Sequence, residues 1–218
     1  DSFPLDKYRA AGIVLPYRIF SKCSGRKCTF CADQRYCLHM PLYQGNAFPI
    51  ADNIQQLIQK YRVPGIYFLD AELPTRFMLN LAKEFCQKKV NIRWGSNARF
   101  CPSLSKNENA DLLFQSGCRM LRLGLETASP EILKSMHKGI SLTVASEVLK
   151  TLFSKGIVTH VYLMQGFPGS TKEDWIKTKN FLLAHTEYID MFNVSQFNLY
   201  EDAPLWIKLK KEGALTAQ

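Results

Sequence analysis

The chain has 218 residues, of which 46% are hydrophobic and 22% charged, the composition of a single globular domain with a sizeable core. Its formal net charge of +9 fits binding to nucleic acid, to an anionic substrate or to an acidic partner, and it equally fits a solvated basic surface. Hydrophobic runs stay shorter than the ~18–20 residues of a membrane-spanning helix, which excludes a membrane protein.

The start of the chain and its cysteines indicate where the protein works. The first six residues carry two acidic side chains, Asp1 and Asp6, and no basic one, whereas a secretory signal peptide would begin with basic residues. Seven cysteines, an odd number, do not form the disulfide framework of a small secreted domain. We therefore expect a cytoplasmic protein with reduced thiols, some of them metal ligands, and with no membrane partner.

Strand-like hydrophobic runs alternate with amphipathic helical patterns along the whole chain. The predicted strands are Ile13–Phe20, Gly65–Leu69, Val90–Gly95, Met120–Leu125, Val158–Met164 and Phe192–Leu199. The predicted helices lie around Ile54–Tyr61, Met78–Phe85 and Asn107–Ser116, and others begin near Ser129, Ser141, Ser170 and Pro204. Such alternation predicts an α/β fold of six β-α units with parallel strands and right-handed crossovers. Periodicity alone leaves open whether the six units form an open sheet or a partial barrel.

Two of the helices carry clear start signals. Ser129 is followed by Pro130 and Glu131, the order of an N-cap, a proline at the first helical position and an acidic residue. Ser170 and Glu173 have the spacing of a capping box.

Polar residues follow every predicted strand, at the edge of the sheet where ligands of parallel α/β folds gather. They are Asp70 and Glu72; Ser96, Asn97 and Arg99; Glu126, Thr127 and Ser129; Gln165 and Gly166; and Tyr200 and Glu201. A single one of these residues could be a turn residue or a helix cap. Their presence after each strand indicates a shared cavity.

Three cysteines, Cys23, Cys28 and Cys31, follow the first predicted strand within nine residues. Three interpretations are open: a structural zinc ion, an iron–sulfur cluster or unrelated thiols. Zinc needs four ligands, and only Cys37 or His39 lies near enough in sequence to complete the set. Three thiolates on a 4Fe–4S cluster would leave one iron open to a ligand, whereas a fourth from Cys37 would close it. The remaining cysteines divide into two predicted packing residues, Cys86 and Cys118, and an unassigned one, Cys101.

The chain resembles the radical S-adenosylmethionine (radical SAM) superfamily from about residue 12 to residue 214. The most specific element is the cysteine segment with an aromatic residue before its last cysteine, Cys28-Thr-Phe-Cys31, although four residues separate Cys23 and Cys28 where three are usual. Gly117–Pro130 resembles the fourth-strand segment of these enzymes, Met164–Glu173 the fifth-strand turn, and Ala203–Gly213 the exit from the sixth strand. Together these segments are most similar to the branch that often carries a cobalamin-binding domain upstream.

The resemblance implies a partial (β/α)6 TIM-like barrel, one core domain within residues 1–218 and no flanking substrate or cobalamin domain in this chain. It implies a 4Fe–4S cluster on Cys23, Cys28 and Cys31 whose open iron binds S-adenosylmethionine. Reduction of that cluster would cleave a carbon–sulfur bond and yield a 5′-deoxyadenosyl radical. Cobalamin, if it is used, would be held by a domain outside this chain.

The resemblance also implies positions for S-adenosylmethionine. Phe30 would pack near the adenine, and Asp70, Ala71 and Glu72 would meet the amino group. Glu126 would bind the ribose or the amino group, because a carboxylate accepts two hydrogen bonds. The other expected contacts are Ser96, Asn97, Arg99, Gly166, Pro168, Phe197, Asn198 and Leu199.

Substrate and partners are less defined than the cofactors. A small molecule, a peptide and RNA all remain open as substrates, methylation is one of the open reactions, and an external electron donor is expected. The alternative function is a zinc- or cluster-containing nucleic-acid-binding module without radical chemistry, for which the net charge is the motivation.

Overall fold

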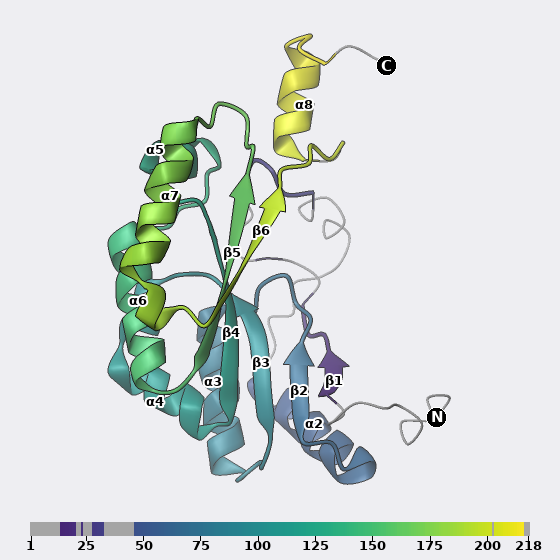
Figure 1. Ribbon diagram of the computed structural model, residues 1–218. Coiled ribbons are helices and arrows are strands. Elements are labelled where there is room, and N and C mark those ends of the chain that lie inside the picture. The colour runs from purple at the N-terminus through teal and green to yellow at the C-terminus, as the bar shows by residue number, and fades with distance from the viewer. Residues whose placement is uncertain (1–13, 21–22, 24–27, 33–45, 202, 216–218) are drawn as a thin grey trace.

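A computed structural model describes residues 14–20, 23, 28–32, 46–201 and 203–215 of the chain (Figure 1). Its six strands form one parallel sheet in chain order, and neighbours in the sequence are neighbours in the sheet. The strands are β1 (Val14–Tyr17), β2 (Gly65–Phe68), β3 (Arg93–Ala98), β4 (Cys118–Glu126), β5 (Val158–Gln165) and β6 (Met191–Gln196). This open sheet confirms the predicted α/β class and is consistent with a partial barrel.

Helices connect the strands, so that all six carboxyl ends lie at the same edge of the sheet (Figure 1). They are α2 (Ala47–Tyr61), α3 (Thr75–Gln87), α4 (Asn107–Gln115), α5 (Pro130–Ser135), α6 (Leu142–Ser154), α7 (Lys172–Ala184) and α8 (Pro204–Lys211), with the 3-10 turns η2 (Pro102–Ser105) and η3 (Thr186–Tyr188). Helix α8 stands beyond the carboxyl ends of β5 and β6 (Figure 1). Within the described residues, none of these helices combines the length and the apolar character of a membrane span.

The core fills the space between the sheet and the helices. Leu121, Leu123 and Leu125 alternate along β4, are completely buried, and belong to the same cluster as Leu81 of α3 and Leu149 of α6. Alternation places these side chains on one face of the sheet and leaves the intervening residues for the other face. Burial of each leucine contributes about 2 kcal/mol, so this cluster is the main stabilising feature of the domain.

Several predicted strand boundaries were wrong: the first strand was expected to reach Phe20, but β1 ends at Tyr17, and two further errors have a clear cause. The third strand was expected at Val90–Gly95, but β3 begins at Arg93, because the Val90 amide donates to the Phe85 carbonyl (2.9 Å) and closes the end of α3. The sixth strand was expected to reach Leu199, but β6 ends at Gln196. Hydrophobic runs do not show where backbone pairing begins and ends, and this explains both errors.

The capping box at the start of α7 lies one residue later than predicted. The capping box is formed by Thr171 and Asp174, not by Ser170 and Glu173: the Thr171 hydroxyl accepts from the Asp174 amide (3.3 Å), and the Asp174 carboxylate accepts from the Thr171 amide (2.9 Å). The predicted N-cap at Ser129 is confirmed, since its hydroxyl accepts from the Ile132 amide (3.4 Å).

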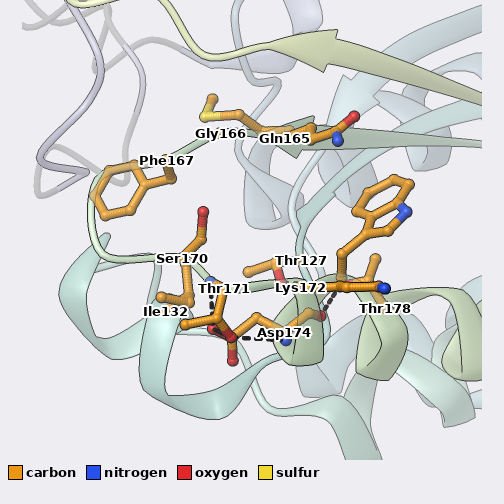
Figure 2. Close-up of a pocket in the computed structure, with 12 residues that line it drawn as sticks. Thr127, Ile132, Gln165, Gly166, Phe167, Ser170, Thr171, Lys172, Asp174 and Thr178 are labelled. Atoms are coloured by element: carbon orange, nitrogen blue, oxygen red, sulfur yellow. Dashed lines mark hydrogen bonds between the residues drawn. The ribbon is translucent and has the colours of Figure 1, made fainter.

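A cavity of about 280 Å³ lies between the turn after β4, the end of β5 and the first turns of α7 (Figure 2). Gln165, Gly166 and Phe167 form one side, and Thr171 and Asp174 form the opposite side (Figure 2). The cavity therefore separates the carboxyl end of β5 from the helix that follows it.

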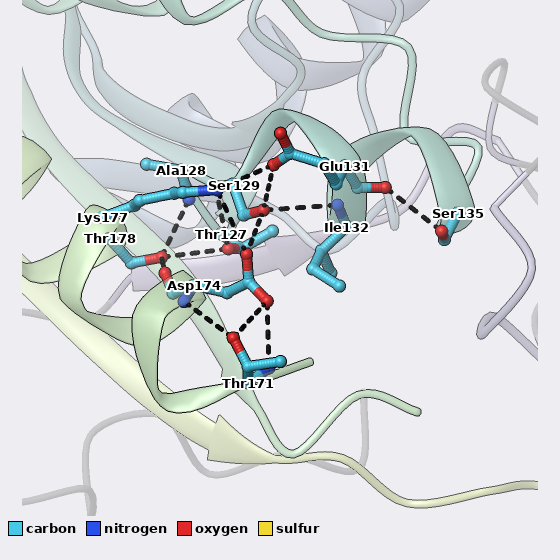
Figure 3. A network of polar contacts seen from close by, with 10 residues as sticks. All are labelled: Thr127, Ala128, Ser129, Glu131, Ile132, Ser135, Thr171, Asp174, Lys177 and Thr178. Carbon is cyan, nitrogen blue, oxygen red and sulfur yellow. Dashed lines mark hydrogen bonds and ion pairs between the residues drawn. The ribbon is translucent and has the colours of Figure 1, made fainter. Parts of the chain in front are cut away.

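A polar network next to this cavity joins the turn after β4 to α7 (Figure 3). The Ser129 hydroxyl donates to the Asp174 carboxylate at 2.6 Å. The Ala128 amide donates to the Thr178 hydroxyl (3.0 Å), which also lies 2.9 Å from the Thr127 hydroxyl. Because the turn belongs to β4 and α7 follows β5, these bonds hold the two strand ends in a fixed relation.

The Asp174 carboxylate gives the network a pH dependence. Hydrogen bonds from Ser129 and from the Thr171 amide lower the pKa of Asp174 to about 2. A carboxyl whose pKa is lower in the folded state stabilises the fold above its unfolded pKa and loses that contribution as the pH falls.

We expect Asp174→Asn to lower the urea midpoint at pH 7, and the difference from the wild type to vanish as the pH falls from about 4 to about 2. Urea unfolding followed by circular dichroism at several pH values would measure this difference. Glu173→Gln, in the same exposed turn of α7, is the matched control and should show little change at any pH. A difference between wild type and Asp174→Asn that stays constant down to pH 2 would contradict the assignment.

Candidate active site

The Cys28–Cys31 segment is held between two helix ends. The Thr29 amide donates to the Met136 carbonyl at the end of α5 (2.9 Å), and the Thr29 carbonyl accepts from the Leu205 amide in α8 (2.8 Å). The Cys31 amide donates to the Cys28 carbonyl (3.3 Å). This bond closes a turn and brings the two cysteines at the ends of the segment toward each other. The cysteine segment thus lies at the carboxyl edge of the sheet, beside the helices that follow β4 and β6.

Asp70, directly after β2, fixes the exit of β1. Its completely buried carboxylate accepts from the Ile19 amide (3.1 Å) and from the Phe20 amide, three residues before Cys23. Burial raises the pKa of Asp70, and the two backbone N–H groups offset part of that rise. Its carbonyl also accepts from the Asn97 side chain at 2.7 Å. The structure therefore places the Asp70 side chain as a support of the cysteine approach and not as a group facing a ligand.

The residues expected from β3 divide between the two faces of the sheet. Ser96 is completely buried on the helix side, and its hydroxyl donates to the Asn97 carbonyl (2.9 Å). Asn97 lies on the other face, where its side chain accepts from the Tyr67 hydroxyl at 2.9 Å. Arg99 follows the strand and reaches the cysteine segment. Of the three residues, Asn97 and Arg99 face the site, and Ser96 does not.

Arg99 is the positive centre of the site. Its guanidinium donates to the Cys28 sulfur (3.7 Å) and to the Lys138 carbonyl. Burial lowers the pKa of Arg99, but the hydrogen bond to Cys28 and the negative charges of Cys28, Glu72 and Cys23 outweigh it and raise the pKa. The Cys23 thiol donates to the buried Glu72 carboxylate at 3.0 Å. One guanidinium therefore lies among two thiols and a carboxylate.

Glu126, the last residue of β4, is paired with a lysine that the sequence analysis did not select. The ammonium group of Lys138 lies 2.6 Å from the Glu126 carboxylate, and the two side chains are only 9% and 12% exposed. No periodic pattern in the sequence marks Lys138 as a site residue. The feature that could have indicated it is its position just before Gly139, after the short helix α5.

The backbone around Glu126 is shaped for this pair. Glu126 has a left-handed backbone (φ 67°), at an irregularity of the β4–β5 pairing between Gly124 and Glu126. A Cβ at Gly124 would lie 2.7 Å from the Glu126 carboxylate and 2.8 Å from the Lys138 nitrogen. Gly124 therefore leaves the space in which the two charged groups meet.

Aromatic residues from distant segments join at the other side of the cysteine segment. Phe30 packs with Phe167 and Phe197 in one hydrophobic cluster, in which the rings of Phe167 and Phe197 are 5.4 Å apart. The Lys138 nitrogen lies 5.8 Å from the centre of the Phe30 ring. Phe30 thus connects the hydrophobic cluster with the charged group around Glu126.

The remaining expected residues lie around this cluster. Gly166 has φ 81°, and a Cβ there would lie 2.5 Å from the Gln196 side chain, so the turn after β5 requires glycine. Ala71 and Pro168 are exposed at the ends of β2 and β5. Asn198 and Leu199 follow β6 and are exposed and half-buried respectively.

The donor set fits an iron–sulfur cluster better than a single ion. Among the residues that the structure describes, no three His, Cys, Asp or Glu side chains are arranged to hold one metal ion. Thiolates of a 4Fe–4S cluster bind different iron atoms and therefore stand wider apart than the ligands of one ion. The zinc interpretation depends on Cys37 or His39, and both lie outside the described residues. The Arg99 guanidinium donates to the Cys28 sulfur and places a positive charge beside this proposed ligand.

The chain is similar in sequence to known methyltransferases. Over 184 residues, 83% of this chain and 39% of the relative, the chain is 25% identical to a Pyrococcus horikoshii protein named as an uncharacterized methyltransferase. It is 30% identical to bacteriochlorophyllide d C-12(1)-methyltransferase of Chlorobaculum tepidum over 107 residues, 49% of this chain and 23% of that one. The chain thus spans about two fifths or less of the length of these relatives.

Solved structures show the same fold. The radical S-adenosylmethionine methyltransferase TsrM of Kitasatospora setae, with cobalamin and a [4Fe-4S] cluster bound, has a TM-score of 0.79 at 19% identity over 93% of this chain and 38% of its own. Coproporphyrinogen III oxidase of Escherichia coli, a radical SAM enzyme, has a TM-score of 0.62 at 15% identity over 89% of this chain and 46% of its own. At these identities the likeness concerns the fold alone.

A family model decides the assignment. The model of the radical SAM superfamily, whose cofactors are a 4Fe–4S cluster and S-adenosylmethionine, matches residues 17–182. This match covers the cysteine segment, Arg99 and the Glu126–Lys138 pair. The chain therefore belongs to the radical SAM superfamily.

Proposed function

We propose that this chain is the catalytic core of a radical SAM methyltransferase, with Cys23, Cys28 and Cys31 as the ligands of the cluster. The observation that carries the proposal is the cysteine segment, anchored at the carboxyl edge of the sheet with Arg99 beside Cys28 and near Cys23. When bound, the reduced cluster supplies the electron that cleaves S-adenosylmethionine to a 5′-deoxyadenosyl radical. The protein's own part is to bind, orient and shield the reactants.

The described residues provide complementary groups for S-adenosylmethionine. The Glu126 carboxylate can accept hydrogen bonds from the ribose hydroxyls or the amino group. Arg99 can bind a carboxylate through its planar fork. Phe30, Gly166 and Phe197 offer an apolar surface for the adenine, with Phe30 and Phe197 already in one cluster. Lys138 donates a hydrogen bond to Glu126 and orients it from the other side.

Methylation is the proposed outcome because both curated relatives carry methyltransferase names and a structural neighbour is a methyltransferase. We propose that residues 12–214 form one core domain and that cobalamin, as in the named TsrM structure, is held by a part of the protein outside this chain. The cluster also requires an external electron donor.

Anaerobic reconstitution tests the cluster assignment. We expect the wild type to bind about four iron atoms and to form 5′-deoxyadenosine from S-adenosylmethionine under dithionite. Cys28→Ala should lose the iron–sulfur absorption and more than ~90% of 5′-deoxyadenosine formation, because one of three ligands is missing. Cys86→Ala, on α3 away from the segment, is the matched control and should retain both. Zinc in place of iron, or full activity of Cys28→Ala, would refute the proposal.

Glu126→Gln tests the expected ligand contact. Loss of the charge weakens the hydrogen bonds to the ribose or amino group, and we expect the Kd for S-adenosylmethionine to rise about tenfold. Equilibrium dialysis of samples with equal iron content would measure the change. Glu131→Gln, an exposed glutamate of α5, should bind normally. An unchanged Kd for Glu126→Gln would show that the carboxylate serves only Lys138.

The Glu126–Lys138 pair has a separate effect on stability. Lys138→Met leaves a buried carboxylate without its partner, and we expect a loss of about 3 kcal/mol in the free energy of unfolding. Urea unfolding would measure it, with the exposed Lys134→Met as the control. The double variant with Glu126→Gln should recover part of the loss, and a double variant as unstable as the sum of the two single ones would argue against the pair.

A further inference from the structure

The face of the sheet opposite the helices carries a second group of chemically active side chains, which we call the polar face. It is formed by Tyr67, Asn97, Arg122, His160, Tyr162 and Asn193. All of them except Asn193, which lies on the exposed strand β6, alternate along their strands with buried residues. The strand register aligns Asn97 with Arg122 and Arg122 with His160, so these residues form a row across three strands.

Contacts within the polar face hold its side chains in place. The guanidinium of Arg122 lies 4.5 Å over the ring of Tyr67. The His160 ring lies 4.8 Å from the Tyr162 ring, and its Nε2 lies 2.6 Å from the Asn193 side-chain oxygen. Stacking of this kind orients a charged group without neutralising it.

Among the residues that the structure describes, no carboxylate balances the positive charge of Arg122 through a salt bridge. Burial raises the pKa of Tyr67 to about 12, although Arg122 lowers it in part, so the phenol stays neutral at pH 7. An arginine on a partly buried surface is normally paired with an anion.

Two nitrogen atoms of the polar face are also unsatisfied. Within the described residues, Arg122 Nε and His160 Nδ1 are buried and have no hydrogen-bond partner. A buried polar group without a hydrogen bond lowers the stability of the fold by about 1–3 kcal/mol. His160 Nε2 is directed to the Asn193 oxygen, which leaves Nδ1 as the ring nitrogen open to a ligand. The face thus offers the Arg122 Nε–H as a donor for an anion, together with an open ring nitrogen of His160.

The polar face adjoins the proposed active site. Asn97 belongs to both, because it accepts from the Tyr67 hydroxyl and donates to the Asp70 carbonyl behind the approach to Cys23. A molecule held at Arg122 would therefore lie next to the residues proposed to bind S-adenosylmethionine.

We infer that the polar face binds the acidic group, a carboxylate or a phosphate, of a small substrate through Arg122, with Tyr67 and Tyr162 providing aromatic surface for the rest of the molecule. The inference rests on the proposed function only in naming the bound molecule as the substrate. The unpaired charge and the two unsatisfied nitrogens stand without it.

Binding of simple probes to the reconstituted chain tests the inference. Benzoate and phenyl phosphate represent the two acidic groups, and benzamide is the neutral analogue of benzoate. At constant ionic strength we expect at least one anion to bind, benzamide to bind at least tenfold more weakly, and Arg122→Gln to raise the Kd of the anion at least tenfold. Calorimetry would measure each Kd, and the preferred anion distinguishes a carboxylate from a phosphate.

Arg119→Gln is the control, because Arg119 lies on the same strand, carries the same charge and donates to the Phe114 and Cys118 carbonyls. It should leave the Kd unchanged. Arg122→Lys keeps the charge but loses the planar fork, so its Kd should lie between those of wild type and Arg122→Gln, which also covers the case in which Arg122→Gln does not fold. Failure of the wild type to bind either anion, or equal weakening by Arg119→Gln, would overturn the inference.

The same samples separate this inference from the proposed function. Formation of 5′-deoxyadenosine by the wild type in the absence of any anion reports on the radical function, and anion binding reports on the polar face. If the wild type forms no 5′-deoxyadenosine but binds the anion in an Arg122-dependent way, the radical function fails and the anion site stands. The reverse result leaves the radical function and removes the anion site.

Discussion

The organisation of the site depends on the hydrogen bonds of the Arg99 guanidinium. It contacts the Cys28 sulfur and the Lys138 carbonyl, and so joins the segment after β1 to the loop after α5. Lys138 in turn holds Glu126 at the end of β4. A fixed positive charge at this point favours thiolates, which are the metal-binding form of cysteine. The Arg99 guanidinium thus both connects the two loops and places a positive charge beside the cysteines.

The sheet serves two purposes through its two faces. One face packs against the helices with completely buried leucines such as Leu121 and Leu123. The other face carries Arg122 and His160 on the same strands. A two-residue repeat in each strand therefore separates the stabilising core from the face proposed to hold the substrate. Substitutions on the polar face can alter binding without opening the core, and this separation suits a fold that hosts many reactions.

The fold class and the location of the site could be predicted from the sequence, whereas several positions within the site could not. Alternating hydrophobic runs were sufficient for six β-α units, because burial on a parallel sheet imposes that pattern. Asp70 was correctly placed after its strand, whereas Ser96 was expected after the third strand and lies inside β3. A polar residue near a strand end can bind backbone groups as well as face a ligand. Only the contacts of Asp70 with the β1 exit distinguish these roles. Lys138 was missed because its partner Glu126 is twelve residues away, beyond any local pattern.

The two backbone bonds of Thr29 have a consequence for the order in which the protein is assembled. One partner, Met136, and the other, Leu205 in α8, both follow the cysteine segment at a large distance in the sequence. The cysteine segment is therefore made before either of its anchors, and it gains the second backbone bond only after α8 has been made. A growing chain holds these thiols in an unfinished site until α8 is in place.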